Sequence, residues 1–440
     1  MKSVTAIFLL SVSAHLALAQ WVAQPRVTTA DLYQVRFIDR NNGWAIGQYF
    51  TRNGTVLLPA NKSSVLRTTD GGNSWSERVL NNFLLRGLTF VNRVGWAAGT
   101  TPSGKGLICK TDDGDLWHLV DSGATRTHYT AIQFLDELHG WVGGWNDTAY
   151  FVMRTANGGV TWQTAYDKSL DVNALFFLDT LKGWDVGENG KIYKTTDGGA
   201  TWQSVFQAPD PYSPLSGSPL RRIRFIDPLH GHAVGGLGGG ETKVWTSDGG
   251  ATWNLVNKTQ GSSLRGVCFT DTTNGWCVGG ANAGLTIQKT TDGGKTWVKQ
   301  QFPALAASVT YFEDIAFVSP TEGWIVADSG YILKTTNGGQ PVTFVANQLN
   351  GTPAAFQLSQ NYPNPFNPAT TISFSLPSES FMTLKVFDAL GREVSSLLAE
   401  ELPAGTHSRQ WNASEFPSGV YYYRLQARSF NETRKLVLLR

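Results

Sequence analysis

The chain has 440 residues, of which 16% are charged, well below the roughly 25% of an average soluble protein. Its 36 Lys and Arg nearly balance 34 Asp and Glu, giving a formal net charge of +2, and they form no basic block, which excludes nucleic acid as the main partner. A hydrophobic content of 41% excludes a disordered chain, whereas 47 Gly and 16 Trp are many for this length and need an explanation.

The N-terminus has the three parts of a secretory signal peptide. Lys2 supplies a positive charge, Ala6 to Ala14 is an apolar stretch, and Ala17-Leu18-Ala19 is a small-x-small cleavage site. We therefore expect residues 1–19 to be removed and the mature chain to begin at Gln20. No later segment reaches 18 apolar residues, so no transmembrane segment is expected after signal removal.

Two short motifs alternate along the chain, seven copies of each. The first is a turn of the form TTDGGATW at Thr195–Trp202, and the second is a strand, a turn and a Gly-Trp pair, as in VRFIDRNNGWAIG at Val35–Gly47. An acidic side chain in such a turn accepts hydrogen bonds from backbone N–H groups, so its role is expected to be structural. The acidic or Asn position recurs at intervals of 40 to 51 residues, at Asp70, Asp112, Asn157, Asp197, Asp248, Asp292 and Asn337.

Each repeat of about 45 residues supplies four short strands. One such sheet cannot bury both of its faces, whereas seven sheets packed radially can, which predicts a seven-bladed β-propeller. The last turn has Pro341-Val342 where the other copies have Thr-Trp or its equivalent. Trp21 stands about as far before the first Phe and Gly-Trp unit as Trp117 stands before the third, so we expect the strand at Trp21 to complete the last sheet.

These motifs match the Asp-box, or BNR, repeat. Their combination closely resembles the photosystem II stability/assembly factor-like propellers, and the resemblance covers about residues 21–345. It implies a seven-bladed propeller, which we place at residues 20–345.

The composition changes near Val345, and we expect a linker at residues 346–356 and a small Ig-like β-sandwich at residues 357–440. The chain is therefore expected to be all-β. The second region resembles the type A C-terminal sorting domain of the type IX (Por) secretion system, which is related in fold to the Ig-like domain of the flagellar hook-capping protein. The residues that carry this resemblance include Asn361, Pro363, Asn364, Pro365, Phe366, Asp388, Gly391, Gly419 and Tyr421.

The second resemblance implies a Gram-negative bacterium of the Bacteroidetes or a related group. It also implies Sec export, passage across the outer membrane with the type IX machinery as a partner, and a secreted or surface location. An ordinary Ig-like adhesion module is the alternative, since small sandwiches host many functions.

The three cysteines match no zinc or redox motif, and no metal or cofactor is expected. Cys268 and Cys277 flank one predicted hairpin and could pair, leaving Cys109 single. Asp112, Asp113 and Asp115 lie in a repeated turn and lack the spacing of a calcium loop.

Ligand-binding residues are expected on the loops opposite the acidic turns. Aromatic and Arg side chains there suit sugar stacking or carboxylate pairing, although solvated loop residues are an equal alternative for each. The candidates are Tyr49, Phe50, Arg52, Arg126, His128, Tyr129, Tyr212, Arg221 and Arg222.

No catalytic residue is identified, because the sequence has no nucleophile elbow, phosphate-binding loop or metal-binding His pair. The favoured function is a non-enzymatic binding or scaffold module, at the cell surface or secreted, for an extracellular glycan or protein. One alternative is a secreted glycoside hydrolase of the sialidase or xyloglucanase type, which needs two suitably spaced carboxylates. Another is an assembly factor of a membrane complex, which the sorting tail disfavours because it sends the propeller outside the cell.

Overall fold

The computed structural model describes residues 21–439 except 54–55, 168–171, 210–216, 238–239, 257–260, 282, 341–354, 362–363, 365 and 428–429. The chain divides into two compact units, Met1–Val342 and Thr343–Arg440. The expected signal peptide and most of the expected linker lie outside the described residues. The described part is all-β apart from one 3-10 turn, Asp328–Gly330, and it contains no helix long and apolar enough to cross a membrane.

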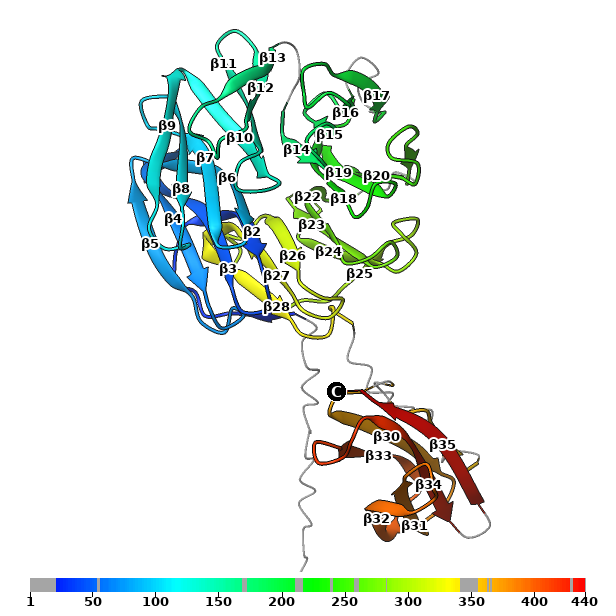
Figure 1. Cartoon of the computed structure of the whole chain (residues 1–440). Helices are drawn as coiled ribbons and strands as arrows, with labels where there is room; N and C mark the ends of the chain where they lie inside the picture. Colours follow the sequence, from blue (N-terminus) through cyan, green and yellow to red (C-terminus); the bar gives the residue numbers. More distant parts are fainter. Residues whose placement is uncertain are drawn as a thin grey trace, which may run out of the picture. The chain divides into compact units, whose positions relative to one another are not determined.

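The described residues of the first unit form seven antiparallel sheets of four strands. Figure 1 shows these sheets arranged around a common centre, with the first strand of each sheet innermost. The first four sheets are β2 (Asp31–Phe37), β3 (Gly43–Asn53), β4 (Val56–Thr68) and β5 (Ser76–Asn81); β6 (Leu84–Val91), β7 (Val94–Thr100), β8 (Lys105–Thr111) and β9 (His118–Thr125); β10 (Thr127–Phe134), β11 (Gly140–Asn146), β12 (Tyr150–Thr155) and β13 (Gln163–Asp167); and β14 (Ala174–Phe177), β15 (Gly183–Val186), β16 (Lys191–Thr195) and β17 (Gln203–Gln207).

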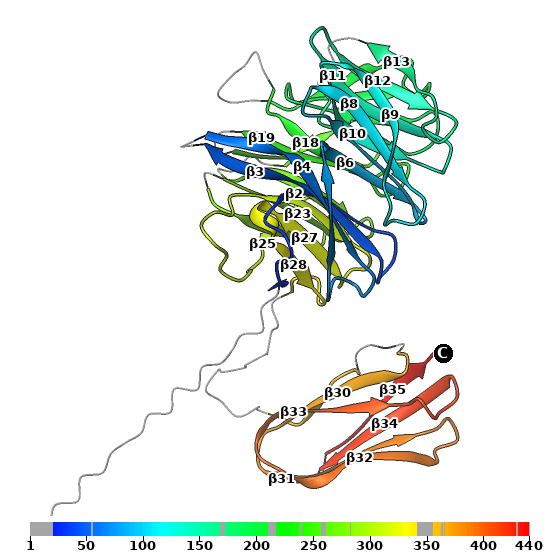
Figure 2. The same ribbon diagram turned by 90° about the vertical axis from the view of Figure 1, so that its left-hand side faces the viewer.

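The last three sheets continue the pattern, and the final one borrows a strand from the start of the chain. They are β18 (Leu220–Phe225), β19 (Gly231–Leu237), β20 (Gly240–Thr246) and β21 (Asn254–Leu255); β22 (Ser263–Phe269), β23 (Gly275–Gly280), β24 (Thr286–Thr290) and β25 (Val298–Lys299); and β26 (Phe312–Phe317), β27 (Gly323–Ala327), β28 (Ile332–Thr335) and β1 (Val22–Ala23). In the view of Figure 2, β3 and β4 run side by side as a long hairpin.

A stacked pair of rings joins each sheet to the next. The ring that follows the repeated Gly lies 3.6–4.0 Å, between centroids, from the motif Phe of the neighbouring sheet. Stacked pairs contribute about 0.5–1.5 kcal/mol each beyond the area that they bury. The pairs are Trp44–Phe90, Trp96–Phe134, Trp141–Phe177, Trp184–Phe225, His232–Phe269, Trp276–Phe317 and Trp324–Phe37.

The Gly before each of these rings is required by the same packing. The motif Phe of its own sheet lies against the Gly, so that a Cβ on Gly43 would stand 2.4 Å from the Phe37 ring. Such a contact is too short for any side chain, and the Gly of the Gly-Trp pair is therefore a packing residue.

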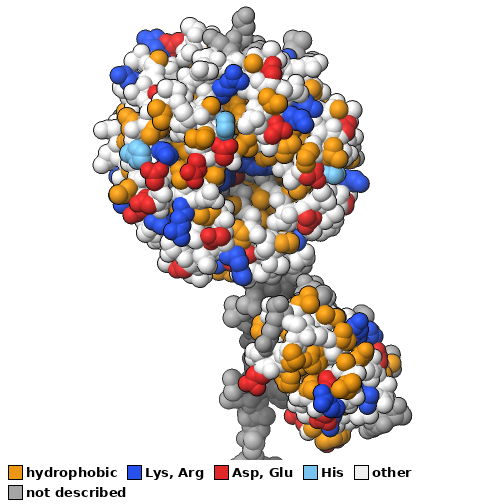
Figure 3. Space-filling model, in the orientation of Figure 1, with side chains coloured by type: hydrophobic (Ala, Val, Ile, Leu, Met, Phe, Trp, Pro, Cys, Tyr) orange, Lys and Arg blue, Asp and Glu red, His pale blue; other side chains and the backbone are white. Residues whose placement is uncertain are grey.

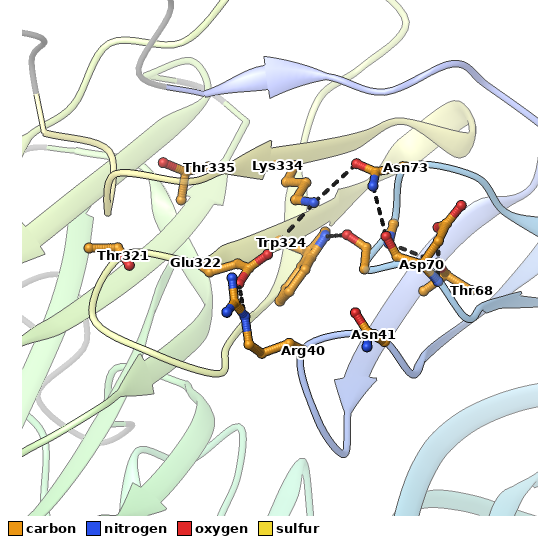
Figure 4. Close-up of polar contacts among 12 residues, drawn as sticks. Arg40, Asn41, Thr68, Asp70, Asn73, Thr321, Glu322, Trp324, Lys334 and Thr335 are labelled. Atoms are coloured by element: carbon orange, nitrogen blue, oxygen red, sulfur yellow. Dashed lines mark hydrogen bonds and ion pairs between the residues drawn. The ribbon is translucent and has the colours of Figure 1, made fainter. Parts of the chain in front are cut away.

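The first and last sheets are joined in the same way as the other neighbours. Figure 4 shows the indole of Trp324 reaching the turn of the first sheet, where its Nε1 donates to the carbonyl oxygen of Gly71 at 3.1 Å. Arg40 Nε contacts Glu322 Oε2 at 2.9 Å across the same boundary. Every sheet of the first unit therefore packs against two others.

Trp21 occupies the place expected for it. Strand β1 pairs with β28, with Val22 opposite Lys334, and Trp21 is fully buried. Its ring meets Phe317 edge-on at 5.8 Å, as Trp75 meets Phe37 at 5.9 Å in the first sheet. The N-terminal strand thus supplies the aromatic ring that the last turn lacks.

The second unit consists of two sheets that share one hydrophobic core. The core includes Leu358, Phe374, Leu384, Trp411 and Tyr423, contributed by both sheets. The strands are β29 (Gln357–Leu358), β30 (Ala369–Leu376) and β33 (Gly405–Asn412) in one sheet, and β32 (Glu393–Leu402), β31 (Ser380–Phe387), β34 (Gly419–Ala427) and β35 (Phe430–Leu438) in the other.

Three residues of the expected sorting motif tie the start of this unit to its other strands. The Asn361 N–H donates to the Tyr423 hydroxyl at 2.8 Å, and Asn364 Oδ1 accepts from the Val437 N–H at 2.9 Å. Phe366 forms a parallel bridge with Leu438. Pro363 and Pro365 lie outside the described residues.

The other four described motif residues lie at turns and strand ends. Asp388 Oδ1 accepts from the N–H groups of Leu390 and Arg392, and Gly391 closes that turn with a φ of 80°. Gly419 begins β34, and the Tyr421 hydroxyl donates to the Pro417 carbonyl oxygen at 2.8 Å.

The disulfide considered for Cys268 and Cys277 is not formed, and all three cysteines are free. The strand register places Cys277 opposite Val267 and Cys268 opposite Trp276. Because side chains alternate between the two faces of a sheet, Cys268 and Cys277 point to opposite faces. Burial raises the pKa of the Cys109 and Cys277 thiols to about 12, so both remain protonated at neutral pH.

We expect the Trp21→Ala substitution to lower the free energy of unfolding by about 3–5 kcal/mol, because it removes a fully buried indole. Trp145→Ala is the matched control, since the Trp145 side chain is 38% exposed. Denaturant unfolding of both variants measures the difference. Equal losses in the two variants would contradict the structural role assigned to Trp21.

Candidate functional site

The repeated acidic turns use their side-chain oxygens internally. In the first turn, Asp70 Oδ1 accepts from the Thr68 hydroxyl at 2.9 Å and from the Ser74 N–H at 2.9 Å, and Asp70 Oδ2 accepts from the Ser74 hydroxyl at 2.6 Å. Equivalent contacts with a preceding Thr involve Asn157, Asp197, Asp248, Asp292 and Asn337. The side chains of these residues therefore stabilise the turns in which they lie.

The second turn uses Asp113 rather than Asp112. Asp113 Oδ1 accepts from the Thr111 hydroxyl at 3.0 Å, whereas Asp112 forms an ion pair with Lys110 at 3.0 Å. The segment between Asp113 and Trp117 is one residue shorter than that between Asp70 and Trp75. An alignment of the repeats on their Trp residues therefore places Asp112, rather than Asp113, at the acidic position.

The innermost strands share a β-bulge at one repeated position. In six of them the pairing register skips one residue, which in β2, for example, lies between Leu32 and Gln34. A bulge leaves its extra residue unpaired and redirects that side chain. The skipped residues are Tyr33, Arg86, Thr130, Arg221, Arg265 and Glu313.

Each of these residues stands four positions before the motif Phe, and in the fourth sheet Asn173 holds the same position. Asn173 precedes β14, and its N–H donates to the Val186 carbonyl oxygen at 2.8 Å. Each of the seven sheets therefore presents one residue at this level.

Another repeated Gly makes room for the bulges. It lies three residues after the ring of the Gly-Trp pair, and a Cβ on Gly47 would stand 2.3 Å from the Asp31 carbonyl oxygen. The same contact would be 2.1 Å between Gly99 and Leu84. Only Gly allows the innermost strand to approach so closely, and this Gly therefore belongs to the architecture of the site.

The seven side chains line one cavity of about 450 Å³, which we call the mouth. Figure 3 shows a hollow near the middle of the first unit with basic side chains inside it. The lining includes four arginines, Arg86, Arg221, Arg222 and Arg265, and one acid, Glu313. Arginines therefore outnumber acids among the lining residues, and Arg221 also forms an ion pair with Glu188, which is not itself part of the lining.

Aromatic rings support two of these guanidinium groups. The Arg86 guanidinium lies 4.4 Å from the centroid of the Tyr33 ring, and that of Arg265 lies 3.7 Å from the Tyr311 ring. Arg265 Nη1 also contacts Glu313 Oε2 at 3.1 Å. Burial raises the pKa of the Tyr33 hydroxyl, and it also raises the pKa of the Glu313 carboxyl in spite of Arg265.

Four of the nine ligand candidates taken from the sequence line the mouth, namely His128, Tyr129, Arg221 and Arg222. Tyr129 is only 3% exposed and donates from its hydroxyl to Asp121 Oδ2 at 3.5 Å, so it mainly supports the wall. His128 stacks on Trp145 at 4.1 Å.

The other candidates lie elsewhere or outside the described residues. Arg126 forms an ion pair with Asp147 at 2.5 Å, and the Tyr49 hydroxyl donates to Glu77 Oε1 at 2.5 Å. Phe50 pairs with Pro59 in the long hairpin of β3 and β4. The side chain of Arg52 and the whole of Tyr212 are not described.

Six of the seven mouth residues at this repeated position were not candidates in the sequence because they lie in or at the ends of strands. These are Tyr33, Arg86, Thr130, Asn173, Arg265 and Glu313. Their signal is the fixed offset of four residues before the motif Phe. In the described part of the chain, no group of three or more His, Cys, Asp and Glu side chains is placed to hold a metal ion.

Two family models match the chain. Residues 252–362 match that of the photosynthesis system II assembly factor YCF48, and residues 360–439 match that of the secretion system C-terminal sorting domain. A search of curated proteins found no significant match. The two resemblances inferred from the motifs are thus confirmed.

Solved structures with similar folds are propellers of low sequence identity. A structure of YCF48 bound to D1 peptide has 19% identity and a TM-score of 0.54, with 72% of this chain and 97% of that chain covered. YCF48 from Cyanidioschyzon merolae has 17% identity and a TM-score of 0.52, covering 72% and 98%. The GH74 xyloglucanase from Xanthomonas campestris has 13% identity and a TM-score of 0.55, covering 81% of this chain and 59% of that one. These likenesses show the propeller fold alone.

The acidic turns predict a specific loss of stability in acid. Hydrogen bonds from Ser74 to Asp70, and from Thr252 to Asp248, lower the pKa of each carboxyl to about 2, compared with about 3.9 in an unfolded chain. A depressed pKa contributes stability that is complete above the unfolded value and is lost as the pH falls through the folded value.

We therefore expect the unfolding free energy of the natural chain to fall between about pH 4 and pH 2, and that of the Asp70→Asn/Asp248→Asn variant to fall less. Asn should keep the turn, since Asn157 and Asn337 make the same contacts with Thr. Urea unfolding at several pH values measures the difference. Parallel losses in both chains would contradict this role of the carboxylates.

Proposed function

We propose that this chain is an exported, non-enzymatic propeller that binds an acidic protein segment in its mouth. The observation that carries the proposal is the convergence of Arg86, Arg221, Arg222 and Arg265 on one cavity with a single acid among its lining residues. Guanidinium groups bind carboxylates through paired hydrogen bonds, and more strongly where water is partly excluded.

The proposed architecture is a seven-bladed Asp-box propeller of residues 20–345 followed by a linker and an Ig-like sandwich of residues 357–440. Its support is the seven four-stranded sheets with a repeated ring contact between neighbours, together with the propeller likenesses. The two-sheet core of the second unit supports the sandwich. Residues 1–19 are proposed to be a signal peptide.

A protein ligand fits the mouth better than a glycan. Sugars bind proteins by stacking on open aromatic faces, but the Arg86 guanidinium lies over the Tyr33 ring and that of Arg265 over the Tyr311 ring. The similar YCF48 structure is described as bound to a D1 peptide, which supports a peptide in the same kind of fold. We propose no membrane-complex assembly role, because the tail matches a secretion sorting domain.

A second candidate function is glycoside hydrolysis. Two adjacent acids of the innermost strand have pKa values displaced in opposite directions, since burial raises that of Glu313, whereas Arg36 and Arg222 hold that of the buried Asp314 below its usual range. Opposite shifts of this kind suit a general acid and its charged partner. Release of reducing ends from a polysaccharide panel, abolished by Glu313→Gln, would favour hydrolysis over binding.

We expect substitution of the mouth arginines to weaken peptide binding. A fluorescein-labelled peptide that ends in three Glu residues should bind the natural chain, and Arg86→Gln and Arg265→Gln should each weaken it about tenfold through the loss of charged hydrogen bonds. Higher salt should weaken binding further. Fluorescence anisotropy measures the dissociation constants.

Arg78→Gln is the control for these variants, because Arg78 pairs with Asp115 on the exposed surface. Unchanged affinity in both mouth variants, or an equal loss in the control, would contradict binding at the mouth.

We also propose that the second unit directs the chain through the type IX machinery to the surface or the medium of a Bacteroidetes-like bacterium. In a host with this machinery, a chain that ends at Val342 should accumulate in the periplasm, while the full chain reaches the surface or the medium. Immunoblots of cell fractions measure the distribution. Surface delivery of the truncated chain would contradict a sorting role of residues 360–439.

A further inference from the structure

A second cavity of about 200 Å³ has a different lining from the mouth and shares with it only Asn173 and Arg222. Its lining includes Gln34, Arg36, Arg222 and Arg224. These residues come from the innermost strands β2 and β18, one or three positions before the motif Phe. We call this cavity the inner chamber.

Small residues in the other innermost strands leave space at this level. The position three before the motif Phe is Gly or Ala, which are too small to fill the centre, in four of the seven copies. These residues are Gly87, Ala131, Ala174 and Gly266. The remaining copies have Gln34, Arg222 and Asp314 at this position. The centre therefore contains both large polar side chains and open space at this position of the innermost strands.

Positive charge exceeds negative charge around the chamber. Asp314 Oδ2 contacts Arg36 Nη1 at 2.7 Å, and Asp314 Oδ1 lies 3.8 Å from Arg222 Nε. The one carboxylate is therefore shared between two guanidinium groups. The nearby acid Glu313 contacts Arg265 at the mouth.

The guanidinium of Arg224 has no carboxylate within ion-pair distance among the described residues. Its Nη1 donates to the carbonyl oxygen of Ile223 at 3.1 Å, within its own strand. Arg222 Nε is buried and has no hydrogen-bond acceptor in the described part of the chain. One carboxylate thus serves two of the three guanidinium groups, while Arg224 has no ion-pair partner and Arg222 Nε has no hydrogen-bond acceptor among the described residues.

Such an arrangement is costly without a counter-charge. Burial disfavours a charged group unless an opposite charge or hydrogen bonds compensate it. Burial and the neighbouring Arg36 lower the pKa of Arg224 to about 9, which reflects that cost. A doubly charged anion would offset the excess charge and accept hydrogen bonds from the free donors.

We propose that the inner chamber binds a small tetrahedral oxyanion of the phosphate or sulfate class, held by Arg222 and Arg224 with Arg36 beside them. An oxyanion matches the fork of N–H donors on each guanidinium. The oxyanion site shares Arg222 with the peptide site at the mouth, but Arg224 lines only the chamber and Arg265 only the mouth, so either proposal can fail alone.

The experiment is a thermal unfolding titration of the full chain with sodium phosphate, with sodium chloride at equal ionic strength as reference. Ligands that bind only the folded state raise the midpoint with concentration. We expect phosphate to raise it by several degrees more than chloride, and sulfate to act similarly. Arg222→Gln and Arg224→Gln should each raise the phosphate concentration for half of the shift about tenfold.

Two further variants separate this site from general effects. Asp314→Asn removes the competing carboxylate and should strengthen phosphate binding, which a merely damaged fold would not do. Arg265→Gln should keep the phosphate shift while weakening the acidic peptide at the mouth. Circular dichroism checks that each variant folds.

No shift beyond that of chloride in the natural chain would overturn the proposal. So would a shift that persists unchanged in whichever of the Arg222 and Arg224 variants fold. If neither variant folds, the absence of tighter phosphate binding in Asp314→Asn would overturn it.

Discussion

The contact on which the first unit depends is the stack of one ring on the motif Phe of the neighbouring sheet. It occurs at all seven boundaries between neighbouring sheets, with six indoles and one imidazole. Each Phe is held from two sides, because the Trp of its own turn, or Trp21 in the last sheet, meets the same ring edge-on. The ring stack is consequently the contact that all boundaries between neighbouring sheets have in common.

The imidazole at one boundary shows how strict this contact is. His232 stacks on Phe269 at 3.7 Å in the place of an indole. Burial lowers the pKa of His232 to about 3, so the ring stays neutral and behaves as a flat, weakly polar surface. Shape and neutrality are therefore the requirements at this position, and a charged ring would not meet them.

Sequence periodicity predicted the repeated sheets and the place of Trp21, because the same residues that repeat in the chain make the contacts between sheets. The prediction failed where a shift of one residue decides which side chain holds a turn or which face of a sheet a side chain occupies. Asp113 replaces Asp112 after a one-residue shortening, and the pairing of Cys277 with Val267 turns Cys268 to the other face. The sequence contains both features, but only the strand register reveals them.

The mouth was harder to predict for a physical reason. Loop residues are the usual ligand candidates, but the bulges turn strand residues such as Arg86 and Arg265 toward the centre. These residues all stand four positions before the motif Phe, but this spacing alone does not show that their side chains face the centre. The β-bulge in the strand pairing shows it. Two of the loop candidates, Arg126 and Tyr49, form surface contacts instead.

The repeated bulge separates what builds the scaffold from what faces the ligand. Gly, Phe and the stacked ring occupy fixed offsets in each sheet, whereas the residue four before Phe is Tyr, Arg, Thr, Asn, Arg, Arg and Glu in turn. The residue at this position is left out of the strand pairing in six sheets. The pairing of the strands therefore does not restrict which amino acid stands there. The centre of the first unit thus presents seven residues that differ from sheet to sheet on a common set of packing residues. One of the seven can be replaced without a change in the contacts that hold the sheets together.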